Sequence, residues 1–113
     1  RREQAEMQCR MFQQAVDDID RAIRMEPKEP LYHAERAVVY YRIGEFAEAL
    51  SSAKKSAELN PEFGDAYRLM GICQLKLNQR EEGLTHLKKA AELGDESAQA
   101  ILQSEEAGDG EKP

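Results

Sequence analysis

The fold of this chain is decided by residues 31–60, which lie between Pro30 and Pro61 and have the sequence LYHAERAVVYYRIGEFAEALSSAKKSAELN. Small residues recur at helical spacing in both halves of this stretch, and Gly44 lies between the halves. Because residues three and four apart share one face of a helix, each half predicts a helix that presents small side chains to the other. The stretch therefore predicts two closely packed antiparallel helices joined by a turn at Gly44.

The same unit recurs on both sides of this stretch with a period of 34 residues. Prolines, small residues, turn residues and aromatic residues agree at this spacing. The matching sets are Pro27 and Pro61; Ala15, Ala49 and Gly83; Ala37 and Gly71; Ile43 and Leu77; Gly44 and Asn78; and Phe12 and Phe46. A fixed period of this length indicates a solenoid, in which each helix pair packs only on its neighbours. Within it, Ala37 and Gly71 are the expected points of closest helix approach.

At these residues the chain resembles the tetratricopeptide repeat family, and the resemblance covers residues 3–95. It implies an all-α fold, a right-handed superhelical α-solenoid of antiparallel helix pairs, with about two and a half repeats and a C-terminal capping helix. The expected units are a partial repeat over 1–27, repeats over 28–61 and 62–95, a capping helix over 96–106 and a disordered tail over 107–113. Three positions depart from the family pattern: Gln74 and Arg80 replace aromatic residues, and Asp95 replaces the proline that ends a repeat.

Apolar residues at helical spacing and the turn residues between them predict the individual helices. We expect helices over 30–43, 46–59, 64–77 and 79–93, and a capping helix with Asp95 as its N-cap. The first 25 residues predict the end of one helix, a turn near residues 9–11 and a complete second helix. Arg10 occupies the position of the turn residues Gly44 and Asn78, however, and arginine does not favour the left-handed conformation. One continuous helix is therefore the alternative.

Composition excludes several classes of partner. The net charge is −6 over 113 residues, which argues against nucleic acid and against an anionic membrane surface. No apolar run approaches the roughly 18 to 20 residues of a membrane span, and no signal-peptide core is visible. The chain begins at Arg1 and not at Met, so a removed targeting segment stays an open alternative. The location is unassigned, with the cytoplasm favoured.

The residues that often carry chemistry do not form a reactive constellation. Cys9 and Cys73 lack Cys-x-x-Cys spacing and are predicted to be buried or half-buried free thiols. His33 and His86 fall on different kinds of helix in different repeats, which argues against a zinc site. No nucleophile-base arrangement and no phosphate-binding glycine loop is present. We therefore predict no catalytic residue, no metal, no cofactor and no enzymatic activity.

Arg36 stands where a Leu or Met is expected, as at Met70 in the next repeat. Some repeats of the family have Arg there, together with an Ala-x-x-Asp-x-Asp-x-Ala pattern in the preceding helix. Residues 15–22 have this pattern. The resemblance implies an ion pair from Arg36 to Asp18 or Asp20, and this structural role is favoured over a role in ligand binding.

The resemblance implies that the first helix of each repeat carries the function. These helices line a concave groove that binds an extended peptide or a helix of a partner protein. The candidate groove residues are Ala34, Glu35, Val38, Tyr41, Arg42, Arg68, Leu69, Ile72, Leu75 and Lys76. Four of the apolar members have no evident role in the core: Val38, Tyr41, Leu69 and Ile72. A binding patch is favoured, and packing against the adjacent first helix is the alternative.

The predicted groove is basic, although the chain as a whole is acidic. Arg42, Arg68 and Lys76 predict a basic ladder, opposed only by Glu35 and Asp65. Such a ladder favours a peptide whose apolar residues are flanked by Asp or Glu. The alternative is that these cations pair with neighbouring carboxylates.

The resemblance also allows a test for one known ligand mode, the clamp that holds the C-terminal carboxylate of chaperone tails. The family uses Lys and Asn on the first helices of the first two repeats, and Lys and Arg on that of the third. The corresponding positions here are Gln4, Glu35, Asp65 and Leu69, and the first clamp Lys falls before Arg1. We predict that this clamp is absent.

The predicted function is a protein-protein interaction module or scaffold that binds a partner in its groove. The first alternative is an architectural spacer or self-association segment that uses Met7, Met11 and Phe12 at the N-terminal end. The second alternative is an accessory domain of an enzyme whose catalytic part lies outside this chain.

Overall fold

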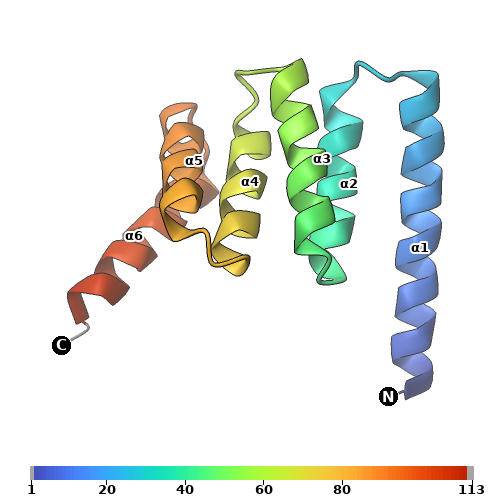
Figure 1. Cartoon of the computed structure of the whole chain (residues 1–113), viewed down its shortest axis with the longest axis horizontal. Helices are drawn as coiled ribbons and strands as arrows, with labels where there is room; N and C mark the ends of the chain where they lie inside the picture. The colour runs from blue at the N-terminus through green and yellow to red at the C-terminus, as the bar shows by residue number, and fades with distance from the viewer. Residues whose placement is uncertain (1, 112–113) are drawn as a thin grey trace.

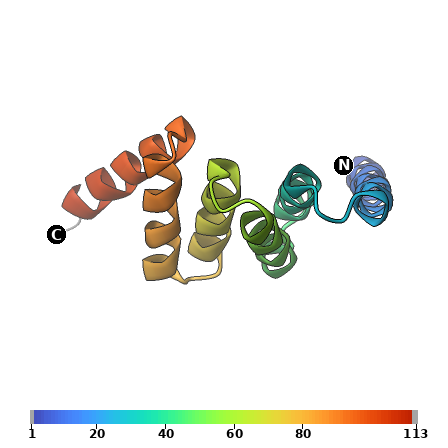
Figure 2. The same ribbon diagram turned by 90° about the horizontal axis from the view of Figure 1, so that it is seen from above.

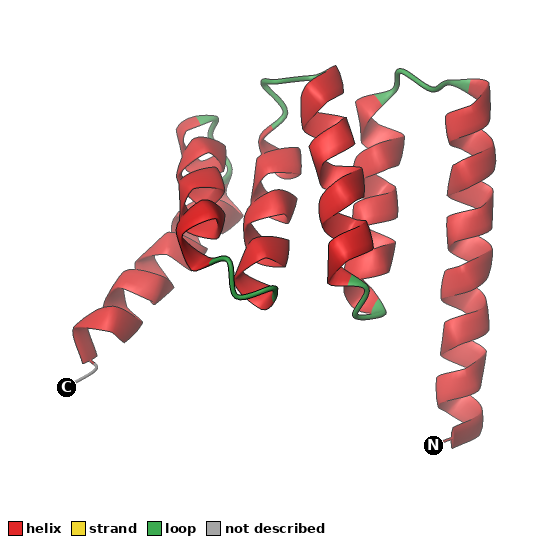
Figure 3. Cartoon of the chain, in the orientation of Figure 1, coloured by secondary structure: helices red, strands yellow, loops and turns green. Residues whose placement is uncertain are grey.

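The described residues form six α-helices and contain no strand (Figure 3). The computed structural model describes the backbone of residues 2–111 and the side chains of residues 6–105. The helices are α1 (Arg2–Met25), α2 (Pro30–Arg42), α3 (Phe46–Leu59), α4 (Gly64–Lys76), α5 (Arg80–Glu92) and α6 (Glu96–Glu111). The predicted all-α solenoid is confirmed, and the ends of α2 to α5 lie within one residue of the predicted ranges.

Each helix packs on the next one in sequence, and α2 also contacts α4. Helices α1 to α5 stand side by side in a row, and α6 turns away from that row at the C-terminal end (Figure 1). Seen from above, α2 and α4 lie on one side of the row and α3 and α5 on the other (Figure 2). The first helices of the two complete repeats therefore share one surface, and their second helices share the opposite one.

The turns that end α2, α4 and α5 each place one residue in the left-handed conformation. Its φ is +84° at Gly44, +62° at Asn78 and +94° at Gly94. The N–H of Glu45 then donates to the carbonyl of Tyr40 at 2.9 Å, and equivalent bonds of 2.8 and 3.0 Å close the other two turns. Glycine has no Cβ and asparagine tolerates this conformation, so these residues end the helices at low cost. The predicted turns at Gly44 and Asn78 are confirmed.

The N-terminal segment is a single helix, α1, and the predicted turn near residues 9–11 is absent. The alternative of one continuous helix is the correct one. Arg10 stands where Gly44 and Asn78 stand in the later repeats, and an arginine side chain makes the left-handed conformation costly. The helix therefore continues, and the side chains of Met7 and Met11 are left 61% and 68% exposed.

Small residues form the core where helices approach most closely. Ala37 and Ala49 have no exposed surface. A Cβ added at Gly71 on α4 would lie 2.6 Å from Cγ of Leu87 and 2.8 Å from the carbonyl oxygen of Gly83, both on α5. Real Cβ atoms do not approach so closely, so the contact between α4 and α5 depends on this glycine pair. The predicted close approach is confirmed at Gly71, and Ala37 is fully buried.

Helix α6 covers the end of the solenoid. Its first turn is capped by Asp95, whose Oδ1 accepts a hydrogen bond from the N–H of Ala98 at 2.8 Å, as predicted. Ala98 is fully buried, and Ile101 and Leu102 pack on the same apolar cluster as Leu87 of α5. This apolar face agrees with the predicted capping role.

The capping helix is longer than the sequence indicated. It continues to Glu111, so the predicted disordered tail over 107–113 is wrong for the backbone of residues 107–111, while residues 112–113 lie outside the described part. Nη1 of Arg80 forms an ion pair of 2.7 Å with Glu105, which fixes the middle of α6 to the start of α5. Once a helix is anchored, each further residue adds a backbone hydrogen bond, so the helix extends beyond its apolar contacts.

Candidate functional site

The predicted groove residues belong to α2 and α4, the two neighbouring first helices. Glu35, Arg42 and Lys76 are exposed; Val38, Tyr41, Arg68, Ile72 and Leu75 are half-buried; and Ala34 and Leu69 are buried. Both helices contribute exposed and half-buried side chains. The surface they share is therefore accessible, although not every predicted member reaches it.

Two predicted groove residues belong to the core. Ala34 is 5% exposed and Leu69 is 4% exposed. Ala34 lies three residues before Ala37, and Leu69 lies four residues before Cys73, so each shares the helix face that packs toward α3. Neither side chain is available to a ligand, and their assignment to the groove is wrong.

The other apolar members are partly covered by neighbouring side chains. The ring of Tyr41 packs against Phe46 with the centroids 5.4 Å apart and the planes tilted by 60°. Cδ2 of Leu75 would lie 3.2 Å from a Cβ added at Gly83, so Leu75 packs toward α5. Leu31 begins α2 and is 47% exposed. The apolar surface therefore consists of partly exposed edges of core residues together with one freely exposed leucine.

Arg68 is already paired and does not extend the predicted basic ladder. Its Nη1 donates to Oδ2 of Asp95 at 2.7 Å and to Oδ1 of Asp65 at 3.3 Å. The side chain of Asp95 is only 5% exposed, whereas that of Asp65 is 52% exposed. The alternative reading, in which neighbouring carboxylates neutralise the cation, is correct for Arg68.

Arg42 and Lys76 remain as exposed cations at equivalent positions one repeat apart. No ion pair of either side chain occurs among the described residues. Each lies in the last turn of its helix, where a positive charge also interacts favourably with the partial negative charge of the helix end. Two positive charges therefore face solvent at the C-terminal ends of α2 and α4.

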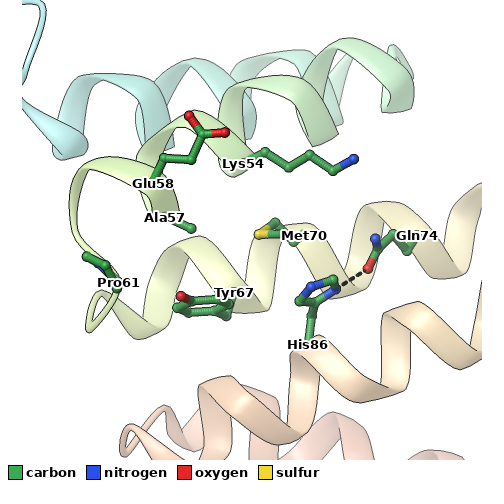
Figure 4. Close-up of a pocket in the computed structure, with 8 residues that line it drawn as sticks. All are labelled: Lys54, Ala57, Glu58, Pro61, Tyr67, Met70, Gln74 and His86. Carbon is green, nitrogen blue, oxygen red and sulfur yellow. Dashed lines mark hydrogen bonds between the residues drawn. The ribbon is translucent and has the colours of Figure 1, made fainter.

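A pocket that the sequence did not reveal lies on the other side of α4. It has a volume of about 410 Å³ and is lined by Lys54, Ala57 and Glu58 of α3, by Pro61, by Tyr67, Met70 and Gln74 of α4, and by His86 of α5 (Figure 4). Tyr67, Met70 and Gln74 recur three and four residues apart, so they share one face of α4. Arg68, Ile72 and Lys76 share the opposite face.

Gln74 and His86 form the polar wall of this pocket, with 2.6 Å between the amide of Gln74 and Nδ1 of His86. The same amide atom lies 3.2 Å from the carbonyl oxygen of Glu82 and 3.3 Å from that of Met70, so we assign it as the NH₂ group, whose two hydrogens are shared among these three acceptors. Nδ1 of neutral His86 then accepts, and the proton lies on Nε2. Burial is the main cause that lowers the pKa of His86; a hydrogen bond to the backbone of Glu82 opposes it, and the nearby ammonium of Lys54 lowers the pKa further.

The predicted ion pair of Arg36 is confirmed, with Asp20 as its partner. Nε of Arg36 lies 3.1 Å from Oδ1 of Asp20, and Nη2 donates to the hydroxyl of Tyr40 at 3.3 Å. The contact with Asp20 has ion-pair distance but not hydrogen-bond geometry, because Nε finds no hydrogen-bond partner within the described residues. Asp18 instead lies 4.0 Å from Arg21.

Both cysteines are free thiols. Cys73 is buried as predicted, and burial raises the pKa of its thiol to about 11. Cys9 is exposed, so its predicted burial is wrong, and residues 6–11 around it on continuous α1 are all exposed as well. Over the residues that the structure describes, no group of three or more His, Cys, Asp or Glu side chains is arranged to hold a metal, and no helix is long and apolar enough to cross a membrane.

Comparison with known proteins agrees with this architecture. The sequence model described as "Tetratricopeptide repeat" matches residues 30–63. The "Protein SGT1 homolog" of Bos taurus is 28% identical over 104 residues, which make up 89% of this chain and 31% of that protein. The chain spans less than a third of the length of the first curated relatives it matches.

Solved structures give the same fold. The first TPR domain of Spaghetti (RPAP3), bound to the HSP90 peptide SRMEEVD, aligns with a TM-score of 0.79 at 23% identity and covers 89% of this chain and 82% of its own. The Sgt2 TPR domain from Aspergillus fumigatus aligns with a TM-score of 0.80 at 22% identity and covers 97% of this chain and 79% of its own. The 34-residue unit, the turns and the arrangement of helices all agree with this match, so residues 30–63 are a tetratricopeptide repeat and the chain has the tetratricopeptide repeat fold.

Proposed function

We propose that this chain is a protein-interaction module that binds a segment of a partner protein across α2 and α4, without a clamp for a C-terminal carboxylate. The observation that carries the proposal is a pair of exposed cations, Arg42 and Lys76, which lie at equivalent positions one repeat apart and form no ion pair within the described residues. Each follows a half-buried apolar residue, Val38 or Ile72, by four positions and so shares its helix face. The fold family supports the general role, because repeats of this kind bind peptides on the surface of their first helices.

The preferred segment carries Asp or Glu beside apolar residues. Because Arg68 is neutralised by two carboxylates, Arg42 and Lys76 supply the local positive charge of this surface. The net charge of −6 repels an acidic partner from most of the remaining surface. Local attraction then guides encounter and fixes the register of the segment, while the apolar contacts supply most of the affinity.

The side chains at the clamp positions support its proposed absence. Glu35 and Asp65 are exposed carboxylates, which repel a peptide C-terminus. Leu69 is buried and does not reach a ligand. We therefore expect SRMEEVD, the HSP90 peptide in the structure of the first TPR domain of Spaghetti, to gain little from its terminal carboxylate here. Its amidated form should bind this chain as well as the free acid does.

A displayed library of random peptides, selected against the chain, tests the proposal. Selected peptides should be enriched in Asp or Glu next to apolar residues. In NMR spectra they should shift the signals of Val38, Ile72, Arg42 and Lys76. Enrichment of basic peptides, or a footprint confined to α3 and α5, would contradict the proposal.

A second candidate function is self-association through α1. It is favoured by Met7 and Met11, which are 61% and 68% exposed on one face of a helix. Size-exclusion chromatography with light scattering should then give a dimer that becomes a monomer in the double variant Met7→Lys and Met11→Lys. A monomer at all concentrations would remove this candidate and leave the groove proposal untouched.

A further inference from the structure

The pocket beside His86 has a counterpart one repeat earlier that is filled by the chain itself. A shift of 34 residues maps Lys54 onto Asp20, Met70 onto Arg36, Gln74 onto Tyr40 and His86 onto Ser52. At the earlier interface the Arg36 side chain reaches from Asp20 on α1 to Tyr40 on α2, and its guanidinium lies 5.2 Å from the centre of the Tyr40 ring. One long cation thus occupies the equivalent position between α1 and α2.

At the later interface the equivalent space is open. Met70 is shorter than arginine and carries no charge, and about 410 Å³ is left between α3, α4 and α5. The charge on the preceding helix is also reversed, since Lys54 stands where Asp20 stood. At the earlier interface the chain therefore places its own cation, Arg36, beside Asp20. At the later interface Lys54 borders a space that no side chain of the described residues fills.

Two donor groups border the open space from different helices. The second ring nitrogen of His86 faces the pocket interior, and it carries the proton because Nδ1 accepts from Gln74 (Figure 4). The side chain of Lys54 extends along the opposite wall, and no ion pair of Lys54 occurs among the described residues. Ala57 and Met70 supply apolar surface between the two donors.

One group in the pocket opposes an anion. Glu58 lines the end near Pro61, while the amide of Gln74 lies at the other end beside His86 (Figure 4). A bound carboxylate is therefore favoured at the end formed by Lys54 and His86, and its aliphatic stem at the apolar centre. This polarity distinguishes the site from a general apolar hollow.

We propose that this pocket binds a glutamate side chain of a partner protein, with the carboxylate between Lys54 and Nε2 of His86 and the methylene groups against Met70 and Ala57. The glutamate replaces, with opposite charge, the arginine that fills the equivalent space one repeat earlier. The site lies on the face of α4 opposite the groove, so a partner segment bound here leaves Arg42 and Lys76 free. It adds a second docking surface that does not depend on the proposed function of the groove.

NMR titration of the full chain with N-acetyl-glutamate N-methylamide tests the proposal. The probe should shift the Met70 methyl signal and the His86 ring nitrogens with a Kd on the order of 1 to 10 mM, as befits so small a ligand. N-acetyl-glutamine N-methylamide has the same shape without the charge and should bind at least about fivefold more weakly. If both probes shift these signals equally, or neither does, the proposal is wrong.

Matched variants separate the pocket from the surface charge of the chain. Lys54→Gln should weaken binding of the glutamate probe at least about fivefold, whereas Lys55→Gln removes the same charge from an exposed neighbour outside the pocket and should leave binding unchanged. Glu58→Gln should strengthen binding. The double variant Arg42→Glu and Lys76→Glu should have no effect here. Equal losses in Lys54→Gln and Lys55→Gln, or probe shifts centred on Arg42 and Lys76, would overturn the assignment.

Discussion

The carboxylate of Asp95 joins Arg68 of α4 to the first turn of α6. Its Oδ2 accepts a hydrogen bond from Nη1 of Arg68 at 2.7 Å, and its Oδ1 accepts one from the backbone N–H of Ala98 at 2.8 Å. One nearly buried side chain therefore caps a helix and neutralises a cation of the preceding repeat. This relationship fixes the capping helix against the solenoid and removes Arg68 from the candidate ligand surface.

Variants of Asp95 separate its two roles. Asp95→Asn keeps an oxygen for the cap and loses the charge, and it should lower the free energy of unfolding by about 1 to 2 kcal/mol. Asp95→Ala loses the cap as well and should cost about 1 kcal/mol more. Urea denaturation measures both. Asp65→Asn removes the exposed partner of Arg68 and should change stability by less than about 0.5 kcal/mol. Equal losses of unfolding free energy in Asp95→Asn and Asp65→Asn would show that the buried ion pair stabilises the fold no more than the exposed one.

Gly71 should tolerate no side chain. In an ordinary helix, Gly→Ala stabilises by about 0.5 to 1 kcal/mol. At Gly71 the added Cβ meets the backbone of Gly83 and the side chain of Leu87, so Gly71→Ala should instead destabilise, by about 1 to 3 kcal/mol, and Gly71→Leu by more. Gly64→Ala is the matched control, because its Cβ would meet no atom closer than 3.5 Å. Thermal melts that rank the two alanine variants equally would contradict the close packing of α4 and α5.

The ion pair between Arg36 and Asp20 should give a measurable coupling energy. A double-mutant cycle with Asp20→Asn and Arg36→Met should show coupling of about 0.5 to 1 kcal/mol, since both side chains are about one-third exposed. The same cycle with Asp18→Asn should show almost none, because Asp18 lies near Arg21 instead. A larger coupling energy with Asp18 than with Asp20 would show that Arg36 pairs with Asp18 and would contradict the structure.

Cys73 should make the fold sensitive to alkali. Its thiol has a pKa of about 11 in the folded chain against 9.0 for an ordinary thiol, so between these values the unfolded state binds fewer protons than the folded state. Stability should then fall by up to about 1.4 kcal/mol per pH unit, and the contribution is complete only below about pH 9. Urea denaturation under reducing conditions should show a shallower alkaline loss in Cys73→Ala than in wild type. Cys9→Ala, which removes the exposed thiol, should follow wild type. Parallel losses in all three proteins would assign the alkaline effect to other groups.

Local sequence signals predicted the architecture well, because turns and close contacts depend on single residues. The left-handed residues Gly44 and Asn78 and the small residue Gly71 each have one physical role that the 34-residue period repeats. The N-terminal segment was harder to predict. The 34-residue period indicated a turn at Arg10, whereas the cost of the left-handed backbone conformation for an arginine argued against a turn there. The structure shows that the local cost prevailed.

The binding surfaces were predicted less well, because they depend on contacts between helices. The helical period places Leu69 near the groove, but only the position of α3 shows that the side chain is buried. Asp95 was recognised as a cap from its place before a helix, whereas its ion pair with Arg68 joins residues 27 positions apart. The pocket beside His86 needs three helices to form. Gln74 gave the one sequence signal for it, as a polar residue at an expected aromatic position.

The most direct test of the interaction surface is the association rate of a library-selected peptide, measured by stopped-flow fluorescence at low and moderate salt. Wild type is compared with Arg42→Glu/Lys76→Glu and with the control Lys55→Glu/Lys88→Glu, which makes the same change in net charge at exposed lysines of α3 and α5. We predict that the groove variant loses about tenfold in rate at low salt and most of its salt dependence, while the control stays near wild type. Equal rates in the two variants, or no change in the groove variant, would contradict the assignment of ligand recognition to α2 and α4.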